Sequence, residues 1–326
     1  MKKFLLASVL SLSFLFPLEA EAIENGKSAL GENVVTFLLK DKNTDKYSLP
    51  TCSGSLIAPQ IVVTAKHCVK GHNSQISWLI DENWEVSFPG ADIQSPELRT
   101  AKILSIFSYP GEFTENDDFA VLVIDTPFPV YGNLKIATKD DLTRFRAAQS
   151  PTLTYGYGSS STSNLQSLVP FKIENKIIQD FPGRSWGPQV FAIQYLKSDS
   201  HICGGDSGGP NYVVDQGAMY FIGPTSFTTR FGCAKGLVGD FHLGGTALAY
   251  KTELLEKAEE FLAKAKSEAE AAAKAVAELK ARQESEAKTK AEAAKKKTTL
   301  ICVKGKTVKK VIAKNPKCPK GYKVKI

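Results

Sequence analysis

Residues 204–210 read Gly-Gly-Asp-Ser-Gly-Gly-Pro, the most informative run in this chain of 326 residues. Glycines on both sides of Ser207 let the backbone approach a bound molecule closely and adopt conformations closed to other residues. Asp206 is too near in sequence to be the base that activates Ser207, so both side chains need partners from other segments. Without such partners the run would be an ordinary turn.

Two other segments carry the remaining groups of a charge-stabilised nucleophile. The run Thr64-Ala65-Lys66-His67-Cys68 follows an apolar stretch, residues 61–63, that is typical of a buried strand. Asp118 leads into a second apolar stretch, residues 119–122. In such a site the histidine takes the serine proton, while the acid fixes the imidazole tautomer and stabilises the imidazolium ion. The three segments, in the order His, Asp, Ser, resemble the chymotrypsin/trypsin family of serine endopeptidases over about residues 23–264.

The resemblance implies a mainly β fold of two antiparallel six-stranded β-barrels with the active site between them. It implies that Ser207 is the nucleophile, that His67 is the general base and then acid, and that Asp118 is the orienting carboxylate. Asp117 is the competing candidate for the orienting role. The backbone N–H groups of Gly205 and Ser207 match the oxyanion hole.

Lys66 departs from the family, whose members have a small residue before His-Cys. Its charge must reach solvent or find an acid, and it would act on the pKa of the neighbouring His67.

The resemblance also places a substrate pocket around His201, Ser226 and Thr228. His201 matches the pocket floor, where trypsin-like enzymes that select Lys or Arg have an acid. A charged His201 would accept an acidic side chain, and a neutral, hydrogen-bonded histidine is the alternative. Thr228 stands where many relatives have glycine, which would exclude large side chains. Ser226 matches a serine that supports the triad acid, and an ordinary strand hydroxyl is the alternative.

Residues 1–22 have the features of a signal peptide: Lys2 and Lys3, an apolar run over residues 4–16, and an Ala-Glu-Ala cleavage site. Cleavage there would make Ile23 the first residue, as in activated family members, whose new α-ammonium pairs with the acid before the nucleophile, here Asp206. Leaving that buried carboxylate unpaired would cost about 3–5 kcal/mol. We therefore expect a secreted or periplasmic protein, of bacterial type, that export itself activates.

Six cysteines in an exported chain indicate disulfides rather than metal ligands. The family pattern implies two pairs and leaves a third in the tail: Cys52–Cys68, Cys203–Cys233 and Cys302–Cys318. His72, His201 and His242 lack close ligand spacing with the cysteines, so we expect no metal and no other cofactor.

The composition changes after the peptidase-like part, residues 23–251. Residues 252–297 are rich in Ala, Glu and Lys and contain no Gly or Pro, which predicts a long α-helix. Heptad positions such as Leu255, Leu262, Val276 and Leu279 follow a coiled-coil register, but alanine fills most of it. A solvated spacer helix is the first interpretation, and a coiled coil with weak self-association is the alternative.

Residues 298–326 contain nine lysines and no acidic residue, and they predict a small hairpin stapled by Cys302–Cys318. The segment resembles short lysine-rich C-terminal modules of bacterial exported proteins. Lysine clusters attract phosphate-bearing polymers or anionic lipid, and a soluble cap without a ligand is the alternative. We expect protein or peptide substrates and no specific nucleic acid. The alternative to an endopeptidase is a catalytically inactive protein that binds or adheres to a surface through its basic tail.

Overall fold

The computed structural model describes residues 23, 26–44, 46–69, 80–111, 114, 116–160, 163–180, 187–197, 200–228 and 242–325. Contacts within the chain divide it into two compact units, Met1–Glu260 and Phe261–Ile326. The predicted signal peptide, His72 and Cys233 lie outside the described residues. Within the described part, no helix is long and apolar enough to cross a membrane.

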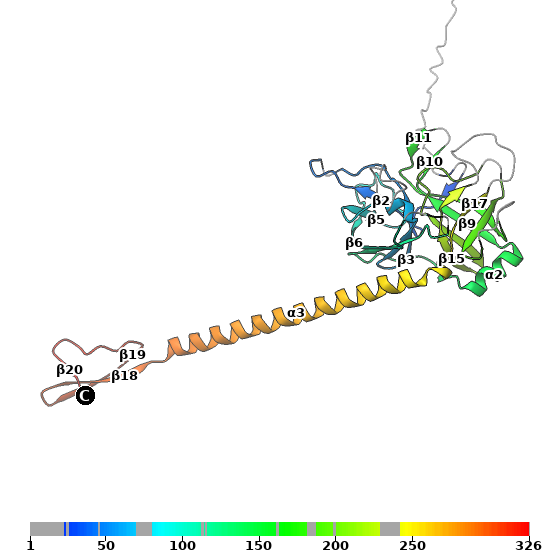
Figure 1. The fold of residues 1–326 in the computed structure, drawn as a ribbon. Helices are drawn as coiled ribbons and strands as arrows, with labels where there is room; N and C mark the ends of the chain where they lie inside the picture. The colour runs from blue at the N-terminus through cyan, green and yellow to red at the C-terminus, as the bar shows by residue number, and fades with distance from the viewer. Residues whose placement is uncertain are drawn as a thin grey trace, which may run out of the picture. The chain divides into compact units, whose positions relative to one another are not determined.

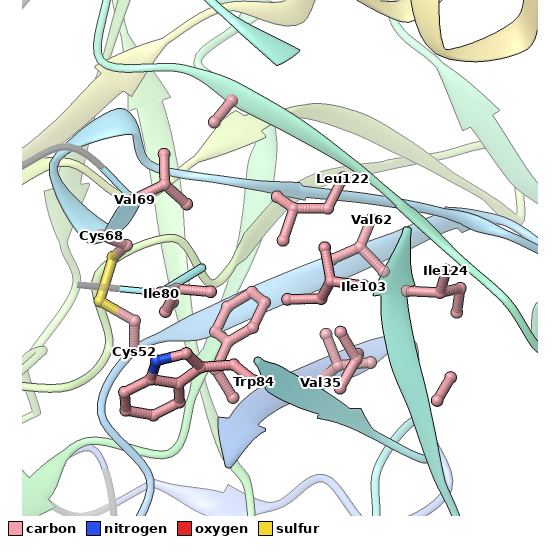
Figure 2. Packing of buried hydrophobic residues seen from close by; sticks show 14 of the residues in the cluster. Val35, Cys52, Val62, Cys68, Val69, Ile80, Trp84, Ile103, Leu122 and Ile124 are labelled. Carbon is pink, nitrogen blue, oxygen red and sulfur yellow. A yellow bond between two sulfur atoms is a disulfide. The ribbon is translucent and has the colours of Figure 1, made fainter. Parts of the chain in front are cut away.

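The first half of the N-terminal unit is a closed antiparallel barrel of six strands in the order β2-β3-β4-β7-β6-β5 (Figure 1). The strands are β2 (Val34–Leu39), β3 (Ser53–Ala58), β4 (Ile61–Thr64), β5 (Trp84–Ser87), β6 (Thr100–Ser108) and β7 (Ala120–Ile124). Apolar side chains such as Val35, Trp84 and Leu122 fill the barrel (Figure 2). Each fully buried side chain of this kind contributes about 1.5–3 kcal/mol. The first predicted barrel and its disulfide, Cys52–Cys68, are confirmed.

The second half of the N-terminal unit is a sheet of nine strands. Eight of them are hydrogen-bonded in the order β16-β17-β13-β12-β9-β14-β15-β8, and the ninth, β1, pairs with β12. The strands are β1 (Lys27–Ser28), β8 (Leu134–Ile136), β9 (Pro151–Gly156), β12 (Phe171–Ile178), β13 (Val190–Tyr195), β14 (Pro210–Asp215), β15 (Ala218–Pro224), β16 (Phe227–Thr228) and β17 (His242–Thr246). β15 and β16 lie near opposite edges of this sheet, but only Thr225 and Ser226 separate them in the chain. The sheet therefore curls and brings its two edges towards each other. The sheet is confirmed, and its closure into a six-stranded barrel stays a prediction.

Two elements of this half differ from the sequence-based expectations. The Ser/Gly-rich composition of residues 158–164 predicts a surface loop, but β10 (Ser159–Ser160) and β11 (Ser163–Gln166) pair antiparallel there. The helix α2 (Lys139–Ala148) was not predicted at all. Thr138 and Asp141 form a capping box at its start, which satisfies N–H groups that the first turn leaves unpaired.

The predicted long helix is α3 (Thr252–Lys295), which follows the short 3-10 helix η1 (Leu248–Tyr250). In its first turns Leu254 and Ala258 are buried, so this end packs on the N-terminal unit. Val276 and Leu279, two of the predicted heptad positions, are exposed in the single chain. Self-association through these positions stays a prediction.

The C-terminal unit contains the predicted hairpin. β18 (Thr298–Lys304) and β19 (Thr307–Ala313) pair antiparallel, and a third strand, β20 (Lys323–Val324), pairs with β18 on its other edge. The disulfide Cys302–Cys318 is present, and Cys302 is fully buried. A segment of this size has little apolar core, so a disulfide is a common way to stabilise it.

Candidate active site

The ladder between β4 and β7 brings two candidate residues together. Thr64, at the end of β4, pairs with Ala120, at the start of β7. The chain leaves β4 into the short helix α1 (Lys66–Val69), which carries His67, and it enters β7 just after Asp118. Because strand register decides which residues lie opposite each other, His67 and Asp118 meet at one end of the first barrel.

Asp118 holds His67 through two hydrogen bonds. Nδ1 of His67 lies 2.7 Å from Oδ2 of Asp118, and the His67 backbone N–H donates to Oδ1 at 2.8 Å. The hydroxyl of Ser226 also donates to Oδ2. Asp118 is 0% exposed, so its charge depends on these donors, because an uncompensated buried charge is strongly destabilising.

The glycine-rich loop brings Ser207 to the same place from the second sheet. The Ser207 carbonyl accepts a hydrogen bond of 2.8 Å from the N–H of Ser53 in the first barrel. A Cβ on Gly208, whose φ is +82°, would lie 2.0 Å from Oγ1 of Thr64. Only glycine allows the loop to approach β4 so closely with this backbone conformation.

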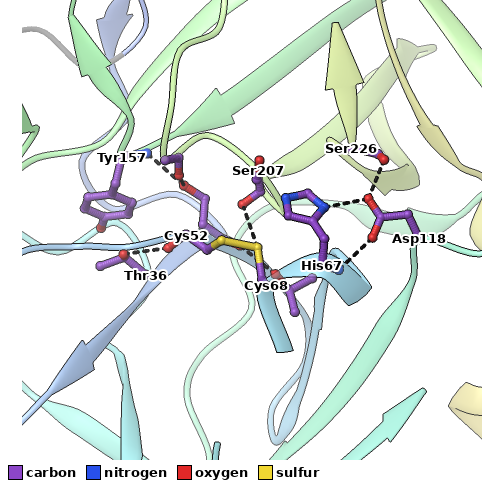
Figure 3. The surroundings of a disulfide bond; sticks show 11 residues. Thr36, Cys52, His67, Cys68, Asp118, Tyr157, Ser207 and Ser226 are labelled. Carbon is purple, nitrogen blue, oxygen red and sulfur yellow. Dashed lines mark hydrogen bonds and ion pairs between the residues drawn. A yellow bond between two sulfur atoms is a disulfide. The ribbon is translucent and has the colours of Figure 1, made fainter. Parts of the chain in front are cut away.

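The backbone N–H groups predicted to form an oxyanion hole belong to Gly205 and Ser207. Gly205 has a φ of +99°, a conformation that favours glycine. Within the described part of the chain, the N–H groups of Gly205 and Ser207 donate to no other group. In Figure 3 the imidazole of His67 lies between Asp118 and Ser207. The two predicted donors and the Ser207 hydroxyl therefore belong to one loop, and the imidazole of His67 lies next to that hydroxyl.

Ser53 is a residue that the sequence did not single out, although it connects the two halves of the site. Its hydroxyl donates to the Gly205 carbonyl at 2.8 Å and accepts from the Tyr157 N–H at 2.9 Å. Its own carbonyl accepts from Oγ1 of Thr64 at 2.8 Å. Together with the bond to Ser207, these contacts fix the loop that carries the candidate nucleophile against the first barrel.

Asp206 is fully buried, and backbone N–H groups hold its carboxylate. Its carboxylate accepts hydrogen bonds of 2.7 Å from the N–H groups of Gly158 and Cys203. Burial nevertheless raises the pKa of Asp206 to about 7, although these hydrogen bonds lower it. Ile23 is buried in the core of the second sheet. Its nitrogen is an amide in the chain that retains residues 1–22, so the ion pair with Asp206 stays a prediction.

Lys66 finds an acid rather than solvent. It is 0% exposed, and its Nζ lies 3.3 Å from Oδ2 of Asp117. Burial opposes ionisation of Asp117, but hydrogen bonds from Thr114 and the Lys66 ammonium hold its pKa below the usual value. Burial also lowers the pKa of Lys251, which Asp117 raises and Lys66 lowers further. Asp117 is therefore paired with Lys66, and Asp118 is the acid beside His67.

One group in the described residues brings metal-type ligands close together: Cys52, His67 and Cys68. The two sulfur atoms are bonded to each other. Neither can be the thiolate that binds a metal.

Comparison with known proteins identifies the family. A family model described as Trypsin matches residues 25–244, which is more than half of the chain. This chain belongs to the trypsin family of serine peptidases. It is 29% identical to a trypsin of Sus scrofa over 191 residues, which are 56% of this chain and 76% of that protein. It is also 30% identical to cationic trypsin-3 of Rattus norvegicus over 192 residues, 56% and 71% of the two chains. A trypsin-like protease of Streptomyces glaucescens is 28% identical over 189 residues, 56% of this chain and 66% of its own length.

Only part of the predicted substrate pocket of this trypsin-family member lies within the described residues. His201 is buried, and its ring lies edge-on to Tyr195 with centroids 6.5 Å apart. Burial raises the pKa of Tyr195, whose hydroxyl accepts a hydrogen bond of 3.2 Å from the Ile202 N–H. Thr228 lies half-buried in β16. Cys203 is disulfide-bonded, and its predicted partner Cys233 lies outside the described residues with the rest of residues 229–241.

Proposed function

We propose that this chain is a serine endopeptidase that hydrolyses peptide bonds through an acyl-enzyme on Ser207. The observation that carries the proposal is the 2.7 Å contact between His67 Nδ1 and the fully buried Asp118. This contact leaves Nε2 of His67 to face Ser207. An acid that holds one ring nitrogen of an imidazole in this way makes the other nitrogen a base.

The residues have distinct roles in the proposed reaction. Oγ of Ser207 attacks the peptide carbonyl carbon while Nε2 of His67 takes the hydroxyl proton, and Asp118 stabilises the imidazolium ion. The N–H groups of Gly205 and Ser207 donate to the oxyanion, and losing one such donor typically lowers the rate about 100-fold or more. His67 then protonates the departing amine as the C–N bond breaks. Water attacks the ester that remains, His67 accepts its proton and returns it to Oγ, and the acid product leaves.

Ser226 acts on the acid rather than on the substrate. Its hydroxyl and the His67 backbone N–H both donate to the carboxylate of Asp118. These donors favour the ionised form of a carboxylate that burial disfavours. They also fix the orientation of Asp118, and through it the imidazole.

Activation follows export in this proposal. Residues 1–22 direct the chain out of the cytoplasm, and their removal converts the Ile23 amide into an ammonium ion. An ammonium beside Asp206 would compensate a buried carboxylate whose pKa is raised to about 7 in the uncleaved chain. N-terminal sequencing of the active enzyme tests this step, and any residue found before Ile23 would refute it.

The proposed pocket does not select Lys or Arg. His201, rather than an acid, matches its floor, and Tyr195 lies next to it. Cleavage of a peptide library tests the proposal, and efficient cleavage after Lys or Arg would contradict it.

We further propose that residues 298–326 retain the enzyme at an anionic surface, because they contain nine lysines and no acidic residue. Charge of one sign attracts polymers and surfaces of the other sign. Deleting residues 261–326 should abolish retention and leave hydrolysis intact. The cut follows Glu260 because Leu254 and Ala258, in the first turns of α3, are buried.

Labelling with an organophosphonate separates the endopeptidase from the inactive binding protein. The mature chain, residues 23–326, should lose peptide hydrolysis as one equivalent of probe attaches to Ser207. Ser207→Ala should neither react nor hydrolyse. A correctly folded mature chain that does not take up the probe would favour the binding protein.

A further inference from the structure

The sheet of the C-terminal unit has two faces that differ in what covers them. Residues directly opposite each other in an antiparallel ladder share a face. Ile301 is opposite Lys310 and Val303 is opposite Val308, so these four residues share one face. Cys302, between Ile301 and Val303, points to the other face.

The segment between β19 and β20 lies against the face that carries Cys302. The disulfide Cys302–Cys318 attaches this segment. Nζ of Lys309, opposite Cys302, lies 5.2 Å from the centroid of the Tyr322 ring. Nζ of Lys304 lies 3.3 Å from the position of a Cβ on Gly321. The same segment therefore occupies several positions along this face.

The other face, here called the open face, consists of Thr299, Ile301, Val303, Val308, Lys310, Ile312 and Lys323. Three of its apolar side chains are exposed: Ile301 by 43%, Val308 by 59% and Ile312 by 56%. Lys310 and Lys323 are exposed on the same face. An exposed apolar patch rimmed by cations is typical of an interaction site.

We propose that the open face docks on the surface of an anionic lipid bilayer, with its isoleucine and valine side chains at the acyl boundary and its lysines among the phosphates. This inference rests on the proposed function of the tail, which is to retain the enzyme at an anionic surface, and it names that surface as a lipid bilayer. Apolar groups gain free energy by entering the interface, and each nearby lysine adds attraction to anionic headgroups.

Two other partners fit the face less well. A soluble polyanion would bind the lysines but would leave Ile301, Val308 and Ile312 in water. A second copy of the sheet would cover the apolar side chains but would bring lysines of the two copies together, because residues 298–326 contain no acidic residue to pair with them. Like charges placed opposite each other disfavour such an interface.

Vesicle co-sedimentation of the mature chain, residues 23–326 with Ser207→Ala to prevent self-cleavage, tests the proposal. Removing residues 1–22 matters because their apolar run would itself bind lipid. Vesicles of equal parts phosphatidylglycerol and phosphatidylcholine should bind the protein, vesicles of phosphatidylcholine alone should bind it weakly, and salt should reduce binding. Ile301→Thr/Ile312→Thr keeps β-branched residues in the strands and should weaken binding roughly 10-fold or more.

The chain offers a matched control. Val276→Thr/Leu279→Thr also removes two exposed apolar side chains, which are 66% and 58% exposed on α3, and it should bind as the parent does. Lys310→Gln/Lys323→Gln should weaken binding about 5-fold or more. Circular dichroism and an intact tail disulfide by mass spectrometry show that each variant is folded.

Three outcomes would overturn the proposal. Absence of binding both to anionic vesicles and to immobilised polyphosphate would refute the retention function and the open face together. Polyphosphate binding, with vesicle binding that the isoleucine variant does not change, would leave retention standing and refute the lipid-docking face. Dimers that the isoleucine variant dissociates would assign the face to a second copy.

Discussion

Asp117→Asn should destabilise the N-terminal unit strongly, because it leaves the ammonium of Lys66 without its acid. Lys66 is 0% exposed and lies 3.3 Å from Asp117, while Lys251 is a second cation near the pair. Removing one partner of a buried ion pair costs about 3–5 kcal/mol. For a domain of this size, that loss lowers Tm by roughly 6–20 °C.

Lys66→Met should cost less than Asp117→Asn. The remaining Asp117 is partly exposed and keeps its hydrogen bonds from Thr114. In Lys66→Met/Asp117→Asn neither charge is left uncompensated, so the double variant should lose less than the sum of the single losses, by about 1–3 kcal/mol.

Urea denaturation of the four proteins measures this coupling, and Glu174→Gln is the matched control. Glu174 pairs with Lys27 at 2.8 Å, but both side chains are exposed, so its loss should cost less than about 1 kcal/mol. In the wild type, the contribution of the Lys66–Asp117 pair to the free energy of unfolding should be complete above about pH 4. It should be lost as the pH falls further, because the pKa of folded Asp117 lies below its ordinary 3.8. Losses that add up in the double variant, or an Asp117→Asn loss no larger than that of Glu174→Gln, would refute the reasoning.

Three further predictions concern the proposed catalytic site. Asp118→Asn should lower kcat about 10⁴-fold with little change in KM, because the amide cannot hold the required histidine tautomer; steady-state peptide hydrolysis measures both. Gly208→Ala should prevent the loop from packing and abolish hydrolysis, because its methyl group would lie 2.0 Å from Oγ1 of Thr64, whereas Gly217→Ala, with a φ of +76° but nothing within 4 Å, should cost only about 1 kcal/mol. The uncleaved chain should lose about 3 kcal/mol of stability as the pH rises from 4 to 7, because folded Asp206, with its pKa raised to about 7, binds a proton that the unfolded chain has released. In the mature chain this loss should be much smaller, since the new ammonium favours ionised Asp206; equal pH profiles of the two chains in thermal melts would contradict that account.

Residues that resemble a family pattern could be placed from the sequence, because their identity and order carry the information. His67, Asp118 and Ser207 belong to this class, as do the apolar strands near them. Ser53 could not be found in this way. All its partners in the site are backbone groups or a strand hydroxyl, and those of its hydroxyl lie 104 and 152 residues away, so no local signal marks it.

The missed helix α2 had a readable signal. Thr138 followed three residues later by Asp141 is the spacing of a capping box. Only Leu142 and Phe145 are buried along the helix. Its apolar face is therefore too narrow to produce a strong helical periodicity.

The choice between Asp117 and Asp118 needed strand register as well as sequence. The β4–β7 ladder places the two successive residues Lys66 and His67 next to the two successive acids. Each residue then takes a different acid: Lys66 contacts Asp117, and His67 contacts Asp118. The sequence contains both pairs, but only the register assigns them.

The separate pairing of Lys66 with Asp117 and of His67 with Asp118 also explains how a lysine can replace the small residue expected before the histidine. An unpaired cation at position 66 would place a full charge beside the candidate base. Paired with Asp117, Lys66 forms a neutral group, whose field falls off faster with distance than that of a single charge. The carboxylate of Asp118 meanwhile keeps its own donors, the His67 N–H, the His67 ring and the Ser226 hydroxyl. Asp117 therefore compensates the charge that Lys66 introduces at this position. The contacts between His67 and Asp118 stay intact.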